Sequence, residues 1–259
     1  MSRQLDADPL GGGAVPRDTP NRQKEDGMTD FHPLLQDPKI EAVLDRAYRE
    51  WKGQRRKLVR LLPLLPRLLL GRKLNWGDMV SRTKDLYLPL EPEQGGLLYI
   101  TARAIGARRV AEYGTSFGVS ALFLAAAVRD NGGGTVIGTE IVPAKADVAR
   151  ANFAEAGVAD LVDLRVGDAR ETLKDCGGPI DLVLLDGFKD IELEVLKILE
   201  PQLRAGALVF TDNIFTFKAD NADKRRYVSD PRNGFRAIVL PLKDGMEAAI
   251  YTGTGAVAT

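Results

Sequence analysis

The most constraining feature of this 259-residue sequence is a regular alternation of short apolar runs and helix-forming segments that begins at Pro92. The apolar runs lie at 108–114, 135–140, 161–167, 181–187 and 207–213. They are apolar on both faces, as strands that are covered on both sides must be. Strands of this kind that alternate with helices predict a parallel sheet between two helical layers.

The end of the sequence departs from this alternation. Residues 235–242 and 246–253 are strand-like and flank a Lys-Asp-Gly turn, which predicts an antiparallel hairpin. The predicted fold is therefore α/β, a doubly wound and mostly parallel sheet of seven strands that is Rossmann-like. We expect a disordered tail at 1–34, a basic N-terminal helical cap at 35–90 and the sheet domain at 91–259.

Composition excludes several kinds of function. Lys plus Arg and Asp plus Glu both number 36, so no global field would attract nucleic acid. The single histidine, His32, makes histidine base catalysis and multi-histidine metal sites very improbable. The single cysteine, Cys176, and the lack of a cleavable signal pattern indicate a reducing compartment, so we expect a cytoplasmic protein.

A basic segment precedes the alternating region. Between Trp51 and Asp78 there are eight Lys or Arg residues and no acid. The apolar run at 58–70 is too short to cross a bilayer, and two prolines interrupt it. Two interpretations stay open: short helices that pack leucines on the main domain, or contact of residues 51–76 with an anionic membrane or a partner.

The first strand-to-helix turn of a doubly wound sheet normally holds a ligand. Here it has the spacing E-x-G-x-x-x-G-x-S, with Glu112, Gly114, Gly118 and Ser120, and it lacks the G-x-G-x-x-G of dinucleotide sites. Glycines let a ligand approach the backbone, and the helix amino terminus offers free amides. An acid at the entrance would disfavour a phosphate and favour a cationic ligand, so we predict S-adenosylmethionine.

Acids end the next two strands as well. Glu140 ends the second, where a carboxylate can accept hydrogen bonds from both ribose hydroxyls. Asp168 ends the third and would lie near the adenine, although capping of the next helix explains an acid there equally well. Three acids at successive strand ends are a stronger indication than any one of them.

A second group follows the fourth and fifth strands. Asp186 ends the fourth, and the pair Asp212-Asn213 ends the fifth. Two carboxylates and an amide oxygen suit a hard divalent cation that keeps water or substrate oxygens in its other positions, which favours Mg²⁺ over zinc. Helix capping and turn formation are the structural alternative for these residues.

From about Leu88 to its end the sequence resembles the class I S-adenosylmethionine-dependent O-methyltransferases of the cation-dependent catechol and caffeoyl-CoA type. The blocks that match in order are "EYGTSFGVSALFLA", "GTEIVPAKADVARANFAEAG", "VGDAR", "LVLLDGFKD", "GALVFTDNIF" and "DGMEAAIYTG". The resemblance implies transfer of a methyl group to a hydroxyl of a small molecule, such as a catechol-like phenol or a natural product. It also adds Thr115, Ser116, Ile141, Ala169 and Asp186 to the cofactor site.

The resemblance gives Lys189 the role of the base that takes the proton of the acceptor hydroxyl, with a pKa lowered by burial and a nearby cation. It further implies that the helical cap closes over the acceptor and that the chain forms a homodimer. Two departures put catechol itself in doubt: Gly187 stands where the catechol enzyme has a histidine, and an acid that contacts the second catechol hydroxyl has no clear counterpart.

Other functions remain to be weighed. A non-catalytic S-adenosylmethionine-binding module, regulatory or at a membrane surface, is the main alternative. Nucleic-acid or protein N-methylation lacks its expected Pro-Pro-aromatic loop, and a nicotinamide dehydrogenase lacks the glycine spacing. The insertion 218–234 is expected at the substrate rim, where Lys224, Arg225 and Arg226 would meet an anionic acceptor or simply be solvated.

Overall fold

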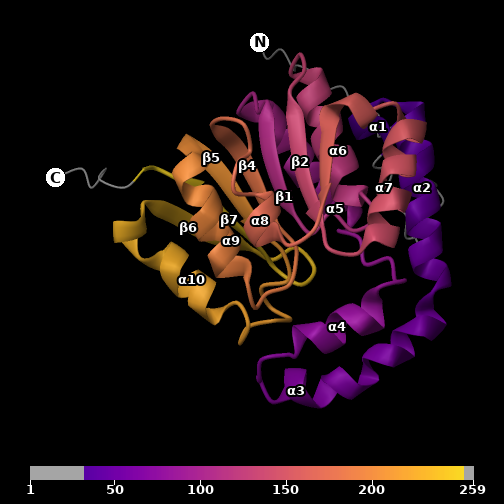
Figure 1. Cartoon of the computed structure of the whole chain (residues 1–259), viewed down its shortest axis with the longest axis vertical. Helices are drawn as coiled ribbons and strands as arrows, with labels where there is room; N and C mark the ends of the chain where they lie inside the picture. Colours follow the sequence, from indigo (N-terminus) through magenta and orange to yellow (C-terminus); the bar gives the residue numbers. More distant parts are fainter. Residues whose placement is uncertain (1–31, 254–259) are drawn as a thin grey trace, which may run out of the picture. The chain divides into compact units, whose positions relative to one another are not determined.

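A computed structural model of the chain describes residues 32–253, in which seven strands form one sheet of order β3-β2-β1-β4-β5-β7-β6 (Figure 1). The strands are β1 Arg109–Tyr113, β2 Thr135–Glu140, β3 Val162–Val166, β4 Ile180–Leu185, β5 Leu203–Thr211, β6 Phe235–Leu240 and β7 Met246–Tyr251. Strands β1 to β5 pair in parallel, and β7 is antiparallel to both β5 and β6. The predicted fold class and closing hairpin are therefore confirmed.

Helices cover both faces of the sheet. One face packs against α5 Pro92–Ala104, α6 Val119–Asp130 and α7 Pro143–Ala156, and α2 Pro38–Gly53 packs on α6 and α7. The other packs against α8 Ala169–Thr172, α9 Glu192–Leu199 and α10 Ala222–Ser229. Four short elements lie elsewhere along the chain: α1 His32–Leu35, η2 Ala159–Leu161, η3 Glu200–Gln202 and η4 Pro231–Asn233.

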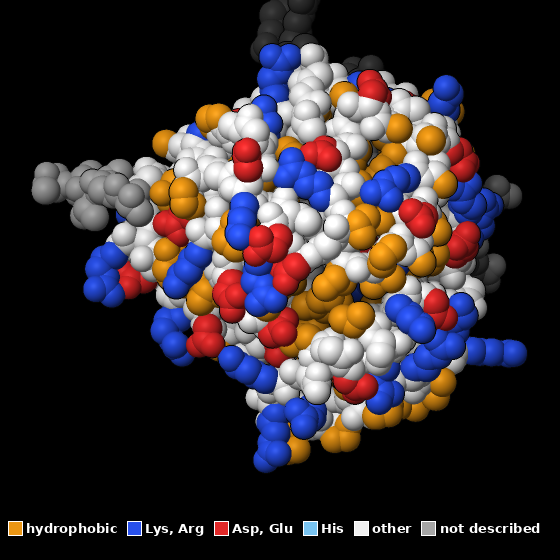
Figure 2. Space-filling model, viewed as in Figure 1, with side chains coloured by type: hydrophobic (Ala, Val, Ile, Leu, Met, Phe, Trp, Pro, Cys, Tyr) orange, Lys and Arg blue, Asp and Glu red, His pale blue; other side chains and the backbone are white. Residues whose placement is uncertain are grey.

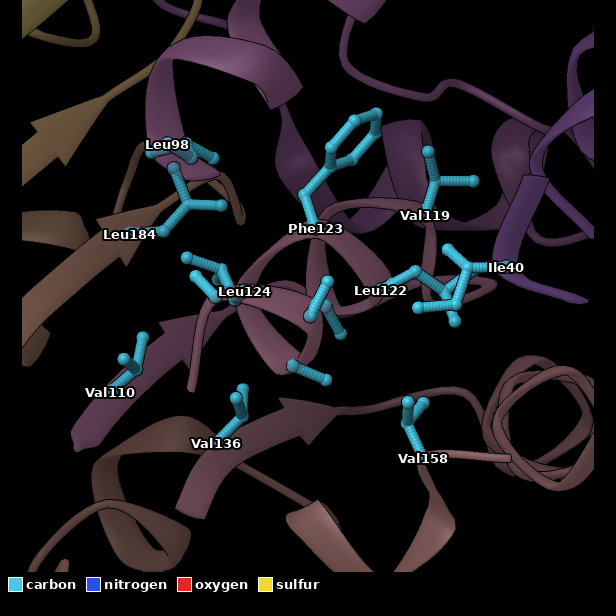
Figure 3. Packing of buried hydrophobic residues seen from close by; sticks show 14 of the residues in the cluster. Ile40, Leu98, Val110, Val119, Leu122, Phe123, Leu124, Val136, Val158 and Leu184 are labelled. Atoms are coloured by element: carbon cyan, nitrogen blue, oxygen red, sulfur yellow. The ribbon is translucent and has the colours of Figure 1, made fainter. Parts of the chain in front are cut away.

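The two layers follow from the pleat of the strands. In β1, Val110 belongs to the first core cluster and its neighbour Ala111 to the second, because successive side chains point to opposite faces. Figure 3 shows the first cluster, in which Leu122 of α6 points toward Ile40 of α2 and Leu124 lies toward Leu184 of β4. This double burial is why the strands read as continuous apolar runs.

The strand order fixes where a ligand can bind. After β1 the chain builds β2 and β3 on one side and then returns to β4 on the other. The point where the order reverses, at the carboxyl ends of β1 and β4, is where doubly wound sheets form a crevice. Gly114 follows β1 and Asp186 follows β4, so the two predicted sites meet there.

Helix α2 is fixed at its start by Asp37. One carboxylate oxygen, Oδ1, accepts hydrogen bonds from the backbone amides of Lys39, at 2.9 Å, and Ile40, at 3.2 Å. The other, Oδ2, pairs with Arg129 of α6. Asp37 therefore both caps α2 and ties it to the helix on which it packs.

The segment after α2 contains η1 Arg55–Leu64, α3 Leu65–Leu69 and α4 Trp76–Thr83. Leu64 packs in a small cluster with Leu74 and Trp76, so part of the leucine run lies inside the fold. Other leucines of the run are exposed, so packing on the main domain accounts for only part of the run. Within residues 32–253, no helix has the length and apolarity needed to cross a bilayer.

The predicted tail, 1–34, falls almost wholly on residues 1–31, outside the described residues, and the described part begins with α1.

Replacement of Asp37 tests how α2 is held. We expect Asp37→Ala to lower the free energy of unfolding by about 1–2 kcal/mol, since it removes a helix cap and a partly exposed ion pair. Asp37→Asn keeps the cap and should cost less. Urea denaturation measures both, with Asp147→Ala as the control because that side chain is 74% exposed. Equal losses for Ala and Asn would contradict the capping role.

Candidate active site

A cavity of about 480 Å³ lies at the carboxyl ends of β1, β2, β4 and β5. Its opposite wall comes from η1 and α4 through Leu61, Trp76, Met79 and Val80. The predicted site residues on its walls are Gly114, Ser116, Glu140, Ile141, Asp168, Ala169, Asp186, Lys189, Asp212 and Asn213. Thr115 and Ser120 line a small adjoining hollow. The sheet edge and the N-terminal helices thus enclose one space.

The glycine turn needs its glycines for close packing. Gly114 has φ +99°, and a Cβ there would lie 2.6 Å from the carbonyl oxygen of Asp186. Gly118 has φ +88°, and a Cβ there would lie 2.5 Å from the Phe153 ring. Both positions combine a left-handed backbone with no room for a side chain. The turn after β1 is therefore pressed directly on the end of β4.

Glu112 lies behind this turn, and neither it nor Gly118 reaches the cavity wall. Its side chain is fully buried, and Oε1 accepts a hydrogen bond from Ser120 Oγ at 2.5 Å. Burial raises the pKa of Glu112, while hydrogen bonds from Ser120 and Thr115 oppose the rise. The geometry favours a structural role in holding the turn over direct contact with a ligand.

Glu140 and Asp168 both line the cavity with partners of their own. The Glu140 carboxylate accepts hydrogen bonds from the backbone amides of Ser116 and Val142, each at 2.8 Å. Asp168 caps α8 and pairs with Arg170 at 2.7 Å, which lowers its pKa. Glu140 is therefore held firmly at the cavity wall. Asp168 lines the cavity and also caps α8, the alternative role predicted for it from the sequence.

Asp186 and Asp212 lie at the ends of neighbouring strands, beside Asn213. Asp212 accepts hydrogen bonds from Gln94 Nε2, at 2.5 Å, and Asn213 Nδ2, at 2.8 Å. No described residue donates a hydrogen bond to the Asp186 carboxylate. Burial raises the pKa of Asp186, and the negative charge of Asp212 raises it further.

This donor set fits a hard dication. Two neighbouring carboxylates that repel each other, one buried and one half-buried, gain most from a positive charge between them, and oxygen ligands suit Mg²⁺. Within residues 32–253, no group of three or more His, Cys, Asp or Glu side chains is placed to hold a metal. An ion bound here would therefore take Asn213 as its third protein ligand and complete its shell with water or acceptor oxygens.

Lys189 is buried against Glu192. Its Nζ lies 2.8 Å from Glu192 Oε1, and both side chains are at most 1% exposed. Burial alone would lower the pKa of Lys189, but the charges of Glu192, Asp186 and Asp212 outweigh it, so the pKa is raised. We predicted a lowered pKa for Lys189. The described residues alone raise it instead.

The wall of the cavity around Trp76 is aromatic. The Trp76 ring lies 5.8 Å from the Phe188 ring and 5.3 Å from the Phe217 ring, measured between centroids. Asp220 holds this group in place, because its Oδ1 accepts hydrogen bonds from Trp76 Nε1 and from the backbone amide of Leu74, both at 3.0 Å. The insertion 218–234 thus contributes to the rim by anchoring Trp76.

Both interpretations of Lys224, contact with an anionic acceptor and simple solvation, are wrong. Its side chain is 2% exposed, forms an ion pair with Glu247 and donates a hydrogen bond to Thr211 Oγ1 at 2.8 Å. In α10, Lys224 lies four residues before the buried Val228, so both share the face that packs inward. Its charge is compensated inside the protein, away from the cavity.

Sequence analysis missed four contributors to the site: Trp76, Gln94, Lys145 and Glu192. Lys145 lines the cavity with its Nζ 3.3 Å from Ser116 Oγ, and burial lowers its pKa. Its position in the first turn of the helix after Glu140 is the only signal that could have found it. Gln94 gave none, since its contact with Asp212 spans 118 residues of sequence.

Comparison with known proteins agrees with this geometry. A family model described as a methyltransferase domain matches residues 111–214. A Mycolicibacterium smegmatis protein whose name proposes an O-methyltransferase is 33% identical to this chain over 175 residues. The match covers 61% of this chain and 81% of the relative. The chain belongs to the S-adenosylmethionine-dependent O-methyltransferases of the catechol and caffeoyl-CoA type.

Two further relatives carry more specific names. Catechol O-methyltransferase from Mycobacterium tuberculosis is 39% identical over 128 residues, 49% of this chain. The match spans only 57% of that relative, little more than half its length. The O-methyltransferase TomG from Streptomyces achromogenes, involved in tomaymycin synthesis and solved in complex with SAM, is 29% identical with a TM-score of 0.59. That comparison covers 67% of this chain and 86% of TomG.

Removal of one charge from the aspartate pair of this methyltransferase tests the cation site. We expect Mg²⁺ to raise the melting temperature of the wild type and to have no effect on Asp186→Asn. The pKa of Asp186 is raised in the fold, so its ionisation lowers stability as the pH rises from about 3.8 through the raised value. Metal-free Asp186→Asn should therefore be at least as stable as the metal-free wild type at neutral pH.

Calorimetry with and without Mg²⁺ measures both effects. Asp147→Asn, on the exposed face of α7, is the matched control and should keep the Mg²⁺ response. An undiminished Mg²⁺ shift in Asp186→Asn would show that the ion binds elsewhere.

Proposed function

We propose that this chain is an S-adenosylmethionine- and divalent-metal-dependent O-methyltransferase that acts on a hydroxyl of a small, largely apolar molecule. The observation that carries the proposal is that one cavity holds both halves of such a site. Gly114, Ser116 and Glu140 line its donor half, while Asp186 and Asp212 lie next to it. Relatives named as a catechol O-methyltransferase and as TomG in complex with SAM support the same activity.

The donor half has the features of a nucleoside and sulfonium site. Glu140 is fixed by two backbone amides and keeps acceptor capacity for the ribose hydroxyls. Ile141 and Ala169 offer apolar contacts on the same wall, where the adenine would lie. Lys145 provides a positive charge beside Ser116, and we assign it to the carboxylate of the methionine moiety.

The aspartate pair and Asn213 would hold the cation, which when bound polarises the acceptor hydroxyl and lowers the pKa of the nearby Lys189. Lys189 then takes the proton of that hydroxyl on Nζ. The oxygen donates its electron pair to the methyl carbon, and the carbon–sulfur pair stays on sulfur as a neutral thioether. The protein's part is to position the reactants and exclude water.

The acceptor half favours a flat, apolar molecule. Trp76, Phe188 and Phe217 surround it, and Leu61 and Met79 extend the apolar wall. We further propose that residues 35–90 act as the cap of this half, since η1 and α4 supply that wall. A homodimer and a cytoplasmic location remain predictions.

Activity is tested with labelled S-adenosylmethionine and a panel of phenols. We expect methyl transfer that EDTA abolishes and Mg²⁺ restores. Lys189→Met should lower kcat by about 10²-fold or more, since it removes the base without adding charge. Binding of S-adenosylmethionine without transfer to any acceptor would favour the non-catalytic alternative. Transfer that chelation leaves unchanged would refute the role of the metal.

Glu192→Gln tests whether Lys189 is the base. The Glu192 carboxylate stabilises the ammonium form, so its loss should lower the pKa of Lys189. Neutral lysine then forms at lower pH, and the rising limb of kcat/KM against pH should move to lower pH. Glu194→Gln, at an exposed position of the same helix, is the control. A limb that stays in place or moves upward would contradict the assignment.

A further inference from the structure

Element η1 sorts its side chains into rows. A 3₁₀ helix has three residues per turn, so residues three apart lie directly above one another. The row of Leu58, Leu61 and Leu64 faces inward, with Leu64 5% exposed. The next row faces outward and continues into α3: Val59 is 58%, Leu62 54% and Leu65 45% exposed.

The outward row continues beyond η1. At the end of α3, Leu69 is 85% and Leu70 67% exposed. The five side chains, Val59, Leu62, Leu65, Leu69 and Leu70, form what we call the leucine surface. Among the described residues it holds five of the thirteen exposed large hydrophobic side chains within a stretch of twelve residues. Single exposed leucines are ordinary, but such a concentration marks an interaction surface.

Cations surround the leucine surface. The flanking side chains include Arg56, Arg67, Arg72 and Lys73, all exposed. Figure 2 shows hydrophobic side chains along the lower edge of the molecule, over the region of α3 in Figure 1, bordered by Lys and Arg. Within residues 32–253, Arg56 and Arg72 take part in no recorded ion pair, so their charges face solvent without compensation.

We propose that the leucine surface docks on the surface of an anionic lipid bilayer. Exposed apolar side chains ringed by Lys and Arg fit the boundary between acyl chains and anionic headgroups. A second copy of this chain fits less well, because a two-fold contact would place these cations against the same cations. The segment between Trp51 and Asp78 offers no acid to relieve that repulsion.

Flotation of the full chain with lipid vesicles tests the proposal. The probes are vesicles of equal parts phosphatidylglycerol and phosphatidylcholine, and vesicles of phosphatidylcholine alone. We expect the protein to float with the anionic vesicles, to float less as salt is raised, and to stay behind with the neutral ones. Leu62→Glu combined with Leu69→Glu should lower the partition coefficient by about tenfold or more.

Ile238→Glu is the matched control, since it adds an acid at a 63% exposed apolar position of β6 and should leave flotation unchanged. Arg56→Glu combined with Arg72→Glu is a second variant that keeps the leucines and should also weaken flotation. Failure of the wild type to float with anionic vesicles would overturn the proposal. Self-association that the leucine variant abolishes, without vesicle binding, would overturn it in favour of a contact between copies.

Discussion

Two adjacent aspartates at the ends of neighbouring strands, Asp212 buried and Asp186 half-buried, are the constraint around which this site is built. Strands β4 and β5 pair with Leu185 opposite Thr211, so the next residues, Asp186 and Asp212, must emerge side by side. The same end of β4 supports the glycine turn, because Gly114 packs on the Asp186 backbone. Because both places lie at the carboxyl end of β4, a ligand in the glycine turn and an ion between the two carboxylates would lie side by side.

The charges beneath the cavity explain why this arrangement favours a cation. Lys189 is the buried ammonium closest in sequence to the pair, but Glu192 holds its Nζ. Two more lysines of this region are buried: Lys224 forms an ion pair with Glu247, and Lys145 lies beside Ser116. Lys189 and Lys224 are each matched by an acid of their own, so these two lysines leave charge on Asp186 and Asp212 uncompensated. A dication is the simplest compensation for that remainder.

The sequence predicted the parts of the site that depend on topology alone. Residues that follow parallel strands must gather at one edge of the sheet, so the sequence was enough to predict that Glu140, Asp186 and Asp212 lie around one space. Contacts between distant segments, such as that of Gln94 with Asp212, leave no such trace. The prediction for Lys224 failed because a Lys-Arg-Arg run is typical of a solvated helix face. The packing of α10 sets the direction of each of these side chains.

The leucine run shows a different limit. Its residues are nearly all apolar, so no polar marker tells which of them face inward until the helix type is known. The three residues per turn of the 3₁₀ helix η1 decide which leucines face inward. They also place Pro63 and Pro66 on a third row of side chains, together with Lys57 and Arg60. Prolines three apart leave both leucine rows unbroken, while Arg60 pairs with Asp85 at 2.8 Å and fixes the rotation of the helix. The same orientation of η1 therefore buries Leu64 against Leu74 and Trp76 and exposes Leu62 to solvent, so the inward packing of one row leaves the neighbouring apolar row on the surface.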